Sequence, residues 1–135
     1  MGTIYTSHIS YVGADRLDIT RKSAGPDGIL FAPSWRILRP MLTARVIGVE
    51  ALRWPQYVLD YTREMQISAQ TFPRAWQHLR ERPEVTLVCY CQLASPPFYC
   101  HRVLLAGMLQ ADGGGDYRGE RGALVPPAPT RRPAP

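Results

Sequence analysis

Three cysteines, a histidine and an arginine towards the C-terminal end of the chain have the side chains needed for thiol chemistry. One residue separates Cys89 from Cys91, and the run Cys100-His101-Arg102 follows. A thiol beside a cation or a helix N-terminus has a lowered pKa, and its thiolate is a nucleophile near neutral pH. These residues therefore predict a reactive or ligand-contacting site, with Cys100 and Cys89 as the thiols and His101 as a proton donor or acceptor.

The same side chains allow two other interpretations. Cysteine is often buried as a small apolar residue, so the three cysteines also fit a purely structural role. Cysteine and histidine bind zinc, but a Cys-x-Cys pair and an adjacent Cys-His pair lack the usual Cys-x-x-Cys spacing. Adjacent residues also reach the same tetrahedral ion with difficulty. We therefore expect no metal or other cofactor, and a structural zinc domain remains an alternative.

Segments typical of strands and helices alternate along the chain. Apolar and β-branched residues predict strands over 3–6, 16–20 and 85–90, and a short edge strand over 116–118. Apolar spacing and helix-delimiting residues predict helices from Ser34 to near Gly48, from Pro55, from Pro73 to Pro83 and from Cys100 to Gln110. Residues 46–49 also fit a short strand. This order favours a small, Rossmann-like, three-layer α/β domain with a mainly parallel sheet over residues 1–121.

The composition changes in the last part of the chain. Five of the thirteen prolines lie in the last ten residues, which predicts a disordered, Pro/Arg-rich tail over 122–135. The net charge is +5, but residues 1–117 contribute only +2 of it, from eleven arginines and one lysine against ten acids. The basic excess therefore lies mainly in or next to the tail, and charge alone does not establish a nucleic-acid surface.

Polar and reactive groups follow the predicted strands at their carboxyl ends, where parallel sheets bind ligands. Ser7 follows the first strand, Arg21 and Lys22 follow the second, and the cysteines follow the third, so we expect these groups to meet. The expected ligand-binding residues are Ser7, Arg21, Lys22, Trp35, Cys91 and Arg102, with Trp35 suited to stack on a base. Arg21 and Lys22 fit a solvated strand end equally well. A cation at the position of Arg102, beside a helix N-terminus, requires an anionic partner.

Several segments, taken in order, carry a resemblance to a known family. They are Ile4-Tyr5-Thr6-Ser7, Ile19-Thr20-Arg21-Lys22, Phe31-Ala32-Pro33-Ser34-Trp35, Tyr61 with Met65, and the strand ending in Cys89-Tyr90-Cys91 followed by Cys100-His101-Arg102. This pattern resembles the domain of unknown function 488 family, in its bacterial and phage branch, over about residues 3–119. The resemblance implies a Rossmann-type domain that acts on nucleotides or nucleic acids. Cys91 departs from the family, which often has glutamate there, and the loop 92–99 is longer than usual.

Three functions remain open. The first is a small enzyme acting on a nucleotide, nucleoside or nucleic-acid base. The second is a non-catalytic module that binds nucleic acid or a partner protein, for example in phage–host conflict, and the third is the zinc domain. No apolar run approaches the roughly 20 residues that cross a bilayer, and the N-terminus lacks a secretory pattern. We therefore expect a cytoplasmic protein without a membrane partner.

Overall fold

The computed structural model describes residues 2–92 and 98–122, which form one parallel sheet and the helices that connect its strands. The elements in chain order are β1 (Gly2–His8), β2 (Arg16–Asp18), the 3-10 helix η1 (Ile29–Phe31), α1 (Trp35–Val46), α2 (Glu50–Thr71), α3 (Pro73–Glu81), β3 (Glu84–Cys89), α4 (His101–Ala111) and β4 (Gly115–Glu120). The tail expected over 122–135 lies outside the described residues, apart from residue 122. Within the described part, no helix is long and apolar enough to cross a membrane.

The sheet has the strand order β2-β3-β1-β4, and every neighbouring pair is parallel. Ile4 lies opposite Val85, and Leu17 lies opposite Leu87, so the apolar side chains of three strands share one face. Because strand side chains alternate between faces, Tyr5 and Thr86 point to the other face. The expected α/β class with a mainly parallel sheet is therefore confirmed.

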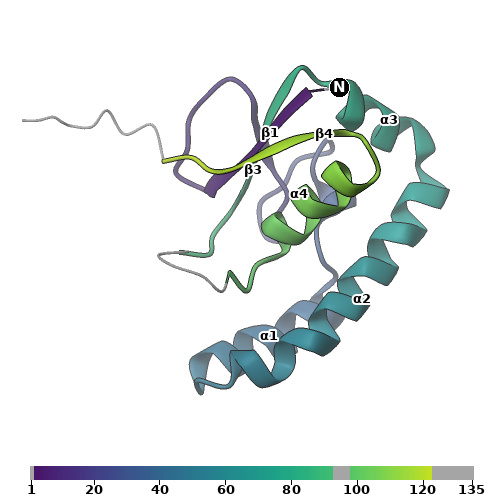
Figure 1. Cartoon of the computed structure of the whole chain (residues 1–135). Coiled ribbons are helices and arrows are strands. Elements are labelled where there is room, and N and C mark those ends of the chain that lie inside the picture. The colour runs from purple at the N-terminus through teal and green to yellow at the C-terminus, as the bar shows by residue number, and fades with distance from the viewer. Residues whose placement is uncertain (1, 93–97, 123–135) are drawn as a thin grey trace, which may run out of the picture.

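The two faces of the sheet are covered differently. The helices lie on the face that carries Ile4 and Leu17, while residues 9–15, which connect β1 to β2, cross the other face (Figure 1). A parallel crossover containing a helix needs about a dozen residues, and this connection is too short for one. We expected helices on both faces of a three-layer domain, and the layer on this face is a loop instead. Arg121 completes this cover, with its guanidinium 3.8 Å from the centre of the Tyr5 ring.

Two helix boundaries differ from those that the sequence predicts. Helix α2 begins at Glu50, so Pro55 lies inside the helix and not in its first turn. Proline lacks a backbone N–H, and the helix continues through it with one hydrogen bond fewer. Residues 46–49 end α1 and turn into α2, and the alternative strand is absent from this described segment.

The core lies between the sheet and the helices, and α2 contributes Tyr57, Tyr61 and Met65 to it. Its buried members are Ile4, Leu17, Ile19, Phe31, Ile37, Met41, Tyr57, Tyr61, Met65, Trp76, Leu79, Val85, Leu87, Leu105, Ala106 and Leu109. The Tyr61 hydroxyl donates to the carbonyl oxygen of Phe31 at 2.7 Å, which fixes the segment leading to α1 against α2.

Removing this hydroxyl tests how firmly that segment is held. We expect Tyr61→Phe to lower the free energy of unfolding by about 1–3 kcal/mol, because the buried Phe31 carbonyl loses its donor. Tyr90→Phe is the control, since its hydroxyl donates to Ser23 at an exposed position. Urea denaturation measures both variants, and equal losses of stability would contradict the assigned role of the Tyr61 hydroxyl.

Candidate functional site

A cavity of about 320 Å³ opens beyond the carboxyl ends of β2 and β3, beside the start of α4. The residues that line it are Thr20, Arg21, Lys22, Trp35, Leu38, Met41, Leu42, Arg45, Tyr57, Cys89, Tyr90, Cys91, Tyr99, Cys100 and His101. The structure thus brings Arg21, Lys22, Trp35 and the three cysteines together around one cavity. The roles of these residues stay predictions.

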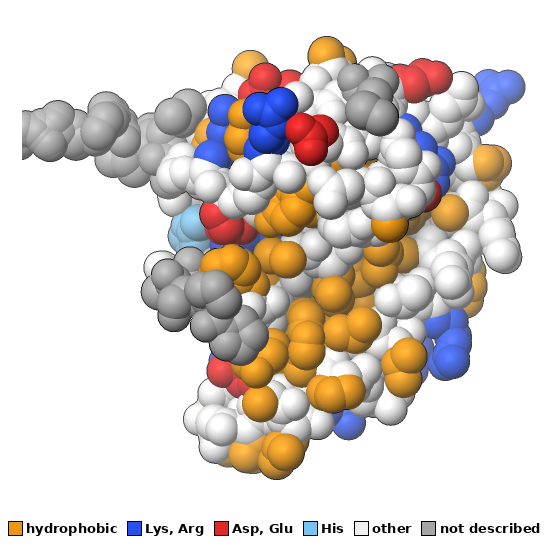
Figure 2. Space-filling view, in the orientation of Figure 1, with side chains coloured by type: hydrophobic (Ala, Val, Ile, Leu, Met, Phe, Trp, Pro, Cys, Tyr) orange, Lys and Arg blue, Asp and Glu red, His pale blue; other side chains and the backbone are white. Residues whose placement is uncertain are grey.

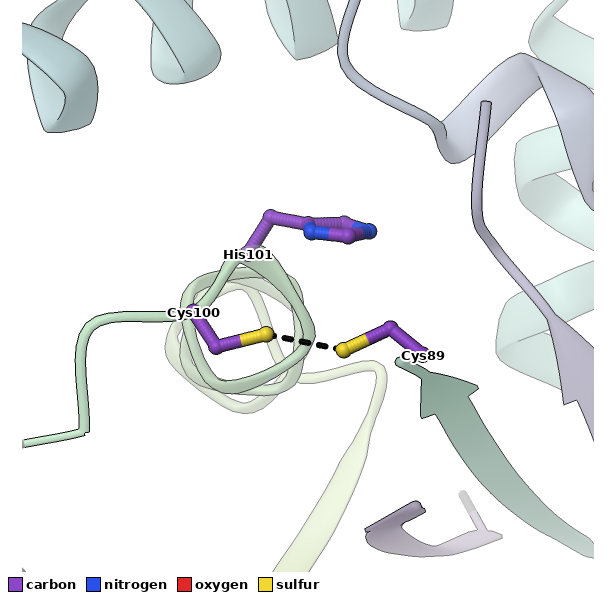
Figure 3. A group of neighbouring side chains, drawn as sticks. All are labelled: Cys89, Cys100 and His101. Carbon is purple, nitrogen blue, oxygen red and sulfur yellow. Dashed lines mark hydrogen bonds between the residues drawn. The ribbon is translucent and has the colours of Figure 1, made fainter. Parts of the chain in front are cut away.

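The three cysteines form one cluster, and all are free thiols. Cys89 is the last residue of β3 and Cys100 is the N-cap of α4, and their Sγ atoms lie 2.9 Å apart (Figure 3). These two side chains are almost fully buried, with 1% and 2% of their surface exposed. Cys91 is only half-buried and lies on the cavity wall. Of the three sulfurs, that of Cys91 is therefore the best placed to meet a ligand.

The cluster favours a single thiolate on Cys91. Hydrogen bonding from the thiols of Cys100 and Cys89 lowers the pKa of Cys91, and the nearby Arg45 guanidinium, with Nη1 3.5 Å from the Cys91 Sγ, acts in the same direction. Burial raises the pKa of Cys89 and also that of Cys100. Because the three groups interact closely, they titrate as a coupled set, and the directions of the pKa shifts favour the thiolate on Cys91.

The expected activation of Cys100 by the helix N-terminus is therefore wrong. Burial of this thiol raises its pKa, and the neighbouring cysteines raise it further. Desolvation disfavours the charged form of a thiol, and here it outweighs the favourable end of the helix dipole. Cys100 is suited to donate its S–H hydrogen within the cluster.

His101 is the first residue of α4, and its ring is buried against Tyr61, with 5.6 Å between the ring centres. Its Nε2 lies 2.8 Å from the carbonyl oxygen of Ile19. A carbonyl accepts only, so Nε2 carries the hydrogen and Nδ1 is the remaining acceptor. Burial lowers the pKa of His101, which favours the neutral ring. A proton reaching this residue therefore binds at Nδ1.

Among the described residues, one group has metal-ligating side chains close enough together to be considered as a metal site. Its members are Cys89, Cys100 and His101. Their ligand atoms all lie within 4.8 Å of one another. Two thiolates on one tetrahedral zinc ion, however, lie about 3.7 Å apart for Zn–S bonds of about 2.3 Å. The Cys89–Cys100 separation of 2.9 Å is shorter than that, so the two sulfurs would have to move apart to share a zinc ion.

Arg102 ties the thiol cluster to the edge strand β4. Its side chain is 1% exposed and donates to both carboxylate oxygens of Glu120, at 2.7 and 3.0 Å, which supplies the anionic partner that we expected. Its Nη1 also donates to the Cys91 carbonyl at 2.8 Å and to the Cys89 Sγ at 3.1 Å. A register shift in the pairing of β4 with β1 sets Glu120 opposite Thr6, on the same face as α4. Arg102 itself does not line the cavity.

The remaining expected ligand-binding residues lie in different surroundings. Arg21 donates to the carbonyl oxygens of Pro33 and Ala32 at 2.9 and 3.2 Å, so part of its guanidinium holds the segment before α1. Lys22 lies over the Tyr90 ring at 5.4 Å. The hydroxyl of Ser7 donates to a backbone carbonyl of Arg121, and Ser7 does not line the cavity.

The sequence interpretation missed Arg45 and three tyrosines of the cavity lining, Tyr57, Tyr90 and Tyr99. Arg45 donates to Glu50 and to the Tyr99 carbonyl, each at 3.0 Å, besides its contact with Cys91. Arg45 follows the buried Met41 by four residues, a spacing that places both on one face of α1. This spacing shows that Arg45 faces inward, but no local pattern shows that it faces the cysteines.

Comparison with known proteins agrees with the family pattern. Residues 29–113 match the family DUF488-N3a, which is described as the active DUF488-N3 subclade. No curated protein and no solved structure matches the chain. The matched segment includes α1 to α3, β3, the described residues that flank loop 92–99, and α4, and thus most of the elements that build the cavity. Since the match spans well over half of the sequence, the chain belongs to the DUF488 family.

Proposed function

We propose that the protein is an enzyme acting on a nucleotide, nucleoside or nucleic-acid base at the cavity described above. The observation that carries this proposal is the composition of the cavity wall. Arg21, Lys22 and Arg45 contribute positive charge, while no carboxylate side chain belongs to the described lining. Three cations against the single Cys91 thiolate favour an anionic ligand, and arginine and lysine are the usual partners of phosphate.

The aromatic side chains in the wall favour a planar group on the same ligand. Trp35 and Tyr90 are 39% and 44% exposed, so both retain free surface, and Tyr57 and Tyr99 line the deeper part with apolar residues of α1. Every nucleic-acid base has a planar π-face, so any base can stack on such side chains. The volume of about 320 Å³ lies at the lower end of small-molecule sites and suits a single nucleotide or less.

Cys91 is the proposed nucleophile of this reaction. Its thiolate would add to a double-bonded, electrophilic carbon of the bound ligand, so that the π electron pair moves to the neighbouring atom and no group has to leave; Arg45 would stabilise the negative charge on sulfur before the attack. Cys89 and Cys100 would hold the Cys91 sulfur through their S–H groups, and Nδ1 of His101 would accept or return a proton.

Nucleotide binding by stacking-deficient variants tests the proposal. We expect isothermal titration calorimetry with nucleoside monophosphates to detect binding, and Trp35→Ala to weaken it by about 5- to 100-fold, as for the loss of one stacked base. Lys22→Ala should weaken a nucleotide more than the corresponding nucleoside. Arg118→Ala, whose side chain is exposed on β4, is the control. If neither nucleotides, nucleosides nor short single strands bind to the wild-type protein, the proposal is wrong.

One observation favours a second function, a module that binds a partner protein. Hydrophobic side chains gather over α1 and α2 on the face shown in Figure 2. Val46, Ile47 and Leu52, near the connection between these helices, are 86%, 67% and 82% exposed. Exposed apolar clusters of this kind often mark interaction surfaces. This function predicts that no nucleotide binds in the cavity and that Cys91→Ser leaves the binding of the partner protein unchanged.

A further inference from the structure

The thiol cluster combines the features of a site of reversible oxidation. Cys91 is reachable from the cavity and lies beside the Arg45 guanidinium, whereas Cys89 and Cys100 are buried behind it in mutual contact. Thiolate character and access decide which cysteine an oxidant attacks first, and a neighbouring thiol then captures the sulfenic acid. The structure supplies one half-buried sulfur beside a guanidinium and two buried sulfurs in contact with each other, and all three cysteines line the same cavity.

We propose that Cys91 is a site of oxidation by hydroperoxides, and that the oxidation ends in a disulfide between Cys89 and Cys100. In the first step the Cys91 thiolate attacks one oxygen of hydrogen peroxide, the O–O bond breaks, and Cys91 sulfenic acid and hydroxide form. The Cys100 sulfur then attacks the sulfenic sulfur, and water leaves as the Cys91–Cys100 disulfide forms. Sulfur is oxidised by two electrons in this sequence, and peroxide is reduced to hydroxide and water.

The final exchange follows from the contact between Cys89 and Cys100. The Cys89 Sγ lies 2.9 Å from the Cys100 Sγ and 3.1 Å from Nη1 of Arg102. Arg102 stabilises the Cys89 thiolate once the Cys89 proton has passed to the hydroxide formed in the first step, which becomes water. The Cys89 thiolate attacks Cys100, the mixed disulfide breaks, and Cys91 departs as a thiolate. A thiol of low pKa is the better leaving group, so Cys91 is released rather than Cys100.

The disulfide would change the site without blocking the Cys91 sulfur. Cys89 and Cys100 would lose the S–H hydrogens that stabilise the Cys91 thiolate, and the end of β3 would be joined covalently to the N-cap of α4. The oxidised protein should therefore have a less acidic Cys91. That the disulfide regulates a reaction at Cys91 rests on the proposed function, whereas the oxidation of the cysteines does not.

Thiol counting by mass spectrometry tests the inference. The reduced protein is treated with hydrogen peroxide, denatured, alkylated with iodoacetamide and mapped by peptide analysis. We expect three alkylated cysteines before oxidation and one afterwards, at Cys91, with the lost thiols recovered by dithiothreitol. Cys91→Ser should slow the loss of thiols at least about tenfold. Cys100→Ser should form no disulfide between these positions and should instead accumulate sulfenic or sulfinic acid on Cys91.

The Cys89→Ser variant isolates the exchange step, because its oxidation should stop at the Cys91–Cys100 disulfide. Three free thiols after peroxide treatment would overturn the inference, as would disulfide formation in Cys91→Ser at the wild-type rate. Native mass spectra that show a bound zinc ion and peroxide-resistant thiols would also overturn it. Nucleotide binding is measured separately on the reduced protein, so oxidation without binding would refute only the proposed function.

Discussion

Arg102→Ala should lower the free energy of unfolding by about 3–5 kcal/mol, the usual effect of removing one partner of a buried ion pair. The Arg102 side chain is 1% exposed and its partner Glu120 is 26% exposed, so water replaces the lost contacts poorly. The substitution also leaves the Cys91 carbonyl without the Arg102 hydrogen bond and the Cys89 sulfur without its cation. Urea denaturation followed by circular dichroism measures the loss.

Two further variants show whether the geometry of Arg102 matters in addition to its charge. Arg118→Ala removes an arginine that pairs with Asp116 on the exposed side of β4, and it should change the stability very little. Arg102→Lys keeps the charge but loses the forked contact with Glu120, so its stability should lie between those of the wild type and Arg102→Ala. Equal stability of Arg102→Ala and Arg118→Ala would show that Arg102 does not hold β4 to the thiol cluster.

Alkylation of Cys91 in the folded protein should depend only weakly on pH between 5.5 and 8.5. Hydrogen bonding from the other two thiols, together with Arg45, lowers the pKa of Cys91, so its thiolate persists as the pH falls. An ordinary thiol of pKa about 8.5 changes its thiolate content roughly 500-fold over this range. A time course of iodoacetamide labelling, quenched at set times and followed by peptide mapping, measures the alkylation rate of Cys91 at each pH.

The Arg45→Gln variant tests one cause of this behaviour. The loss of the guanidinium beside the Cys91 Sγ should raise the pKa of Cys91 and make the labelling rate more dependent on pH. Cys91→Ser is the control, because the two remaining cysteines are buried and their pKa values are raised, so labelling of the folded protein should be slow. A wild-type rate that follows the profile of a free cysteine would contradict the assignment of the thiolate to Cys91.

The local pattern of the sequence was sufficient for most of the fold. Three predicted elements are confirmed, with each end within two residues of the observed one: the strand over 85–90, the helix from Pro73 and the edge strand over 116–118. Each depends on short-range spacing and on residues that begin or stop an element. The loop layer over 9–15 was not foreseen. Its position follows from the strand order, which places β3 between β1 and β2, and local patterns do not contain that order.

Sequence alone determined which chemistry the protein has available: three thiols, an imidazole and guanidinium groups placed at strand ends and at the start of a helix. Only the tertiary structure decided which of the thiols is acidic and which are weak acids. Burial raised the pKa of Cys100, whereas hydrogen bonding from Cys100 and Cys89, assisted by Arg45 from a helix more than forty residues away, lowered the pKa of Cys91. The physical reason is that residue types and spacing are local, whereas desolvation and Coulomb interactions depend on which distant segments pack together.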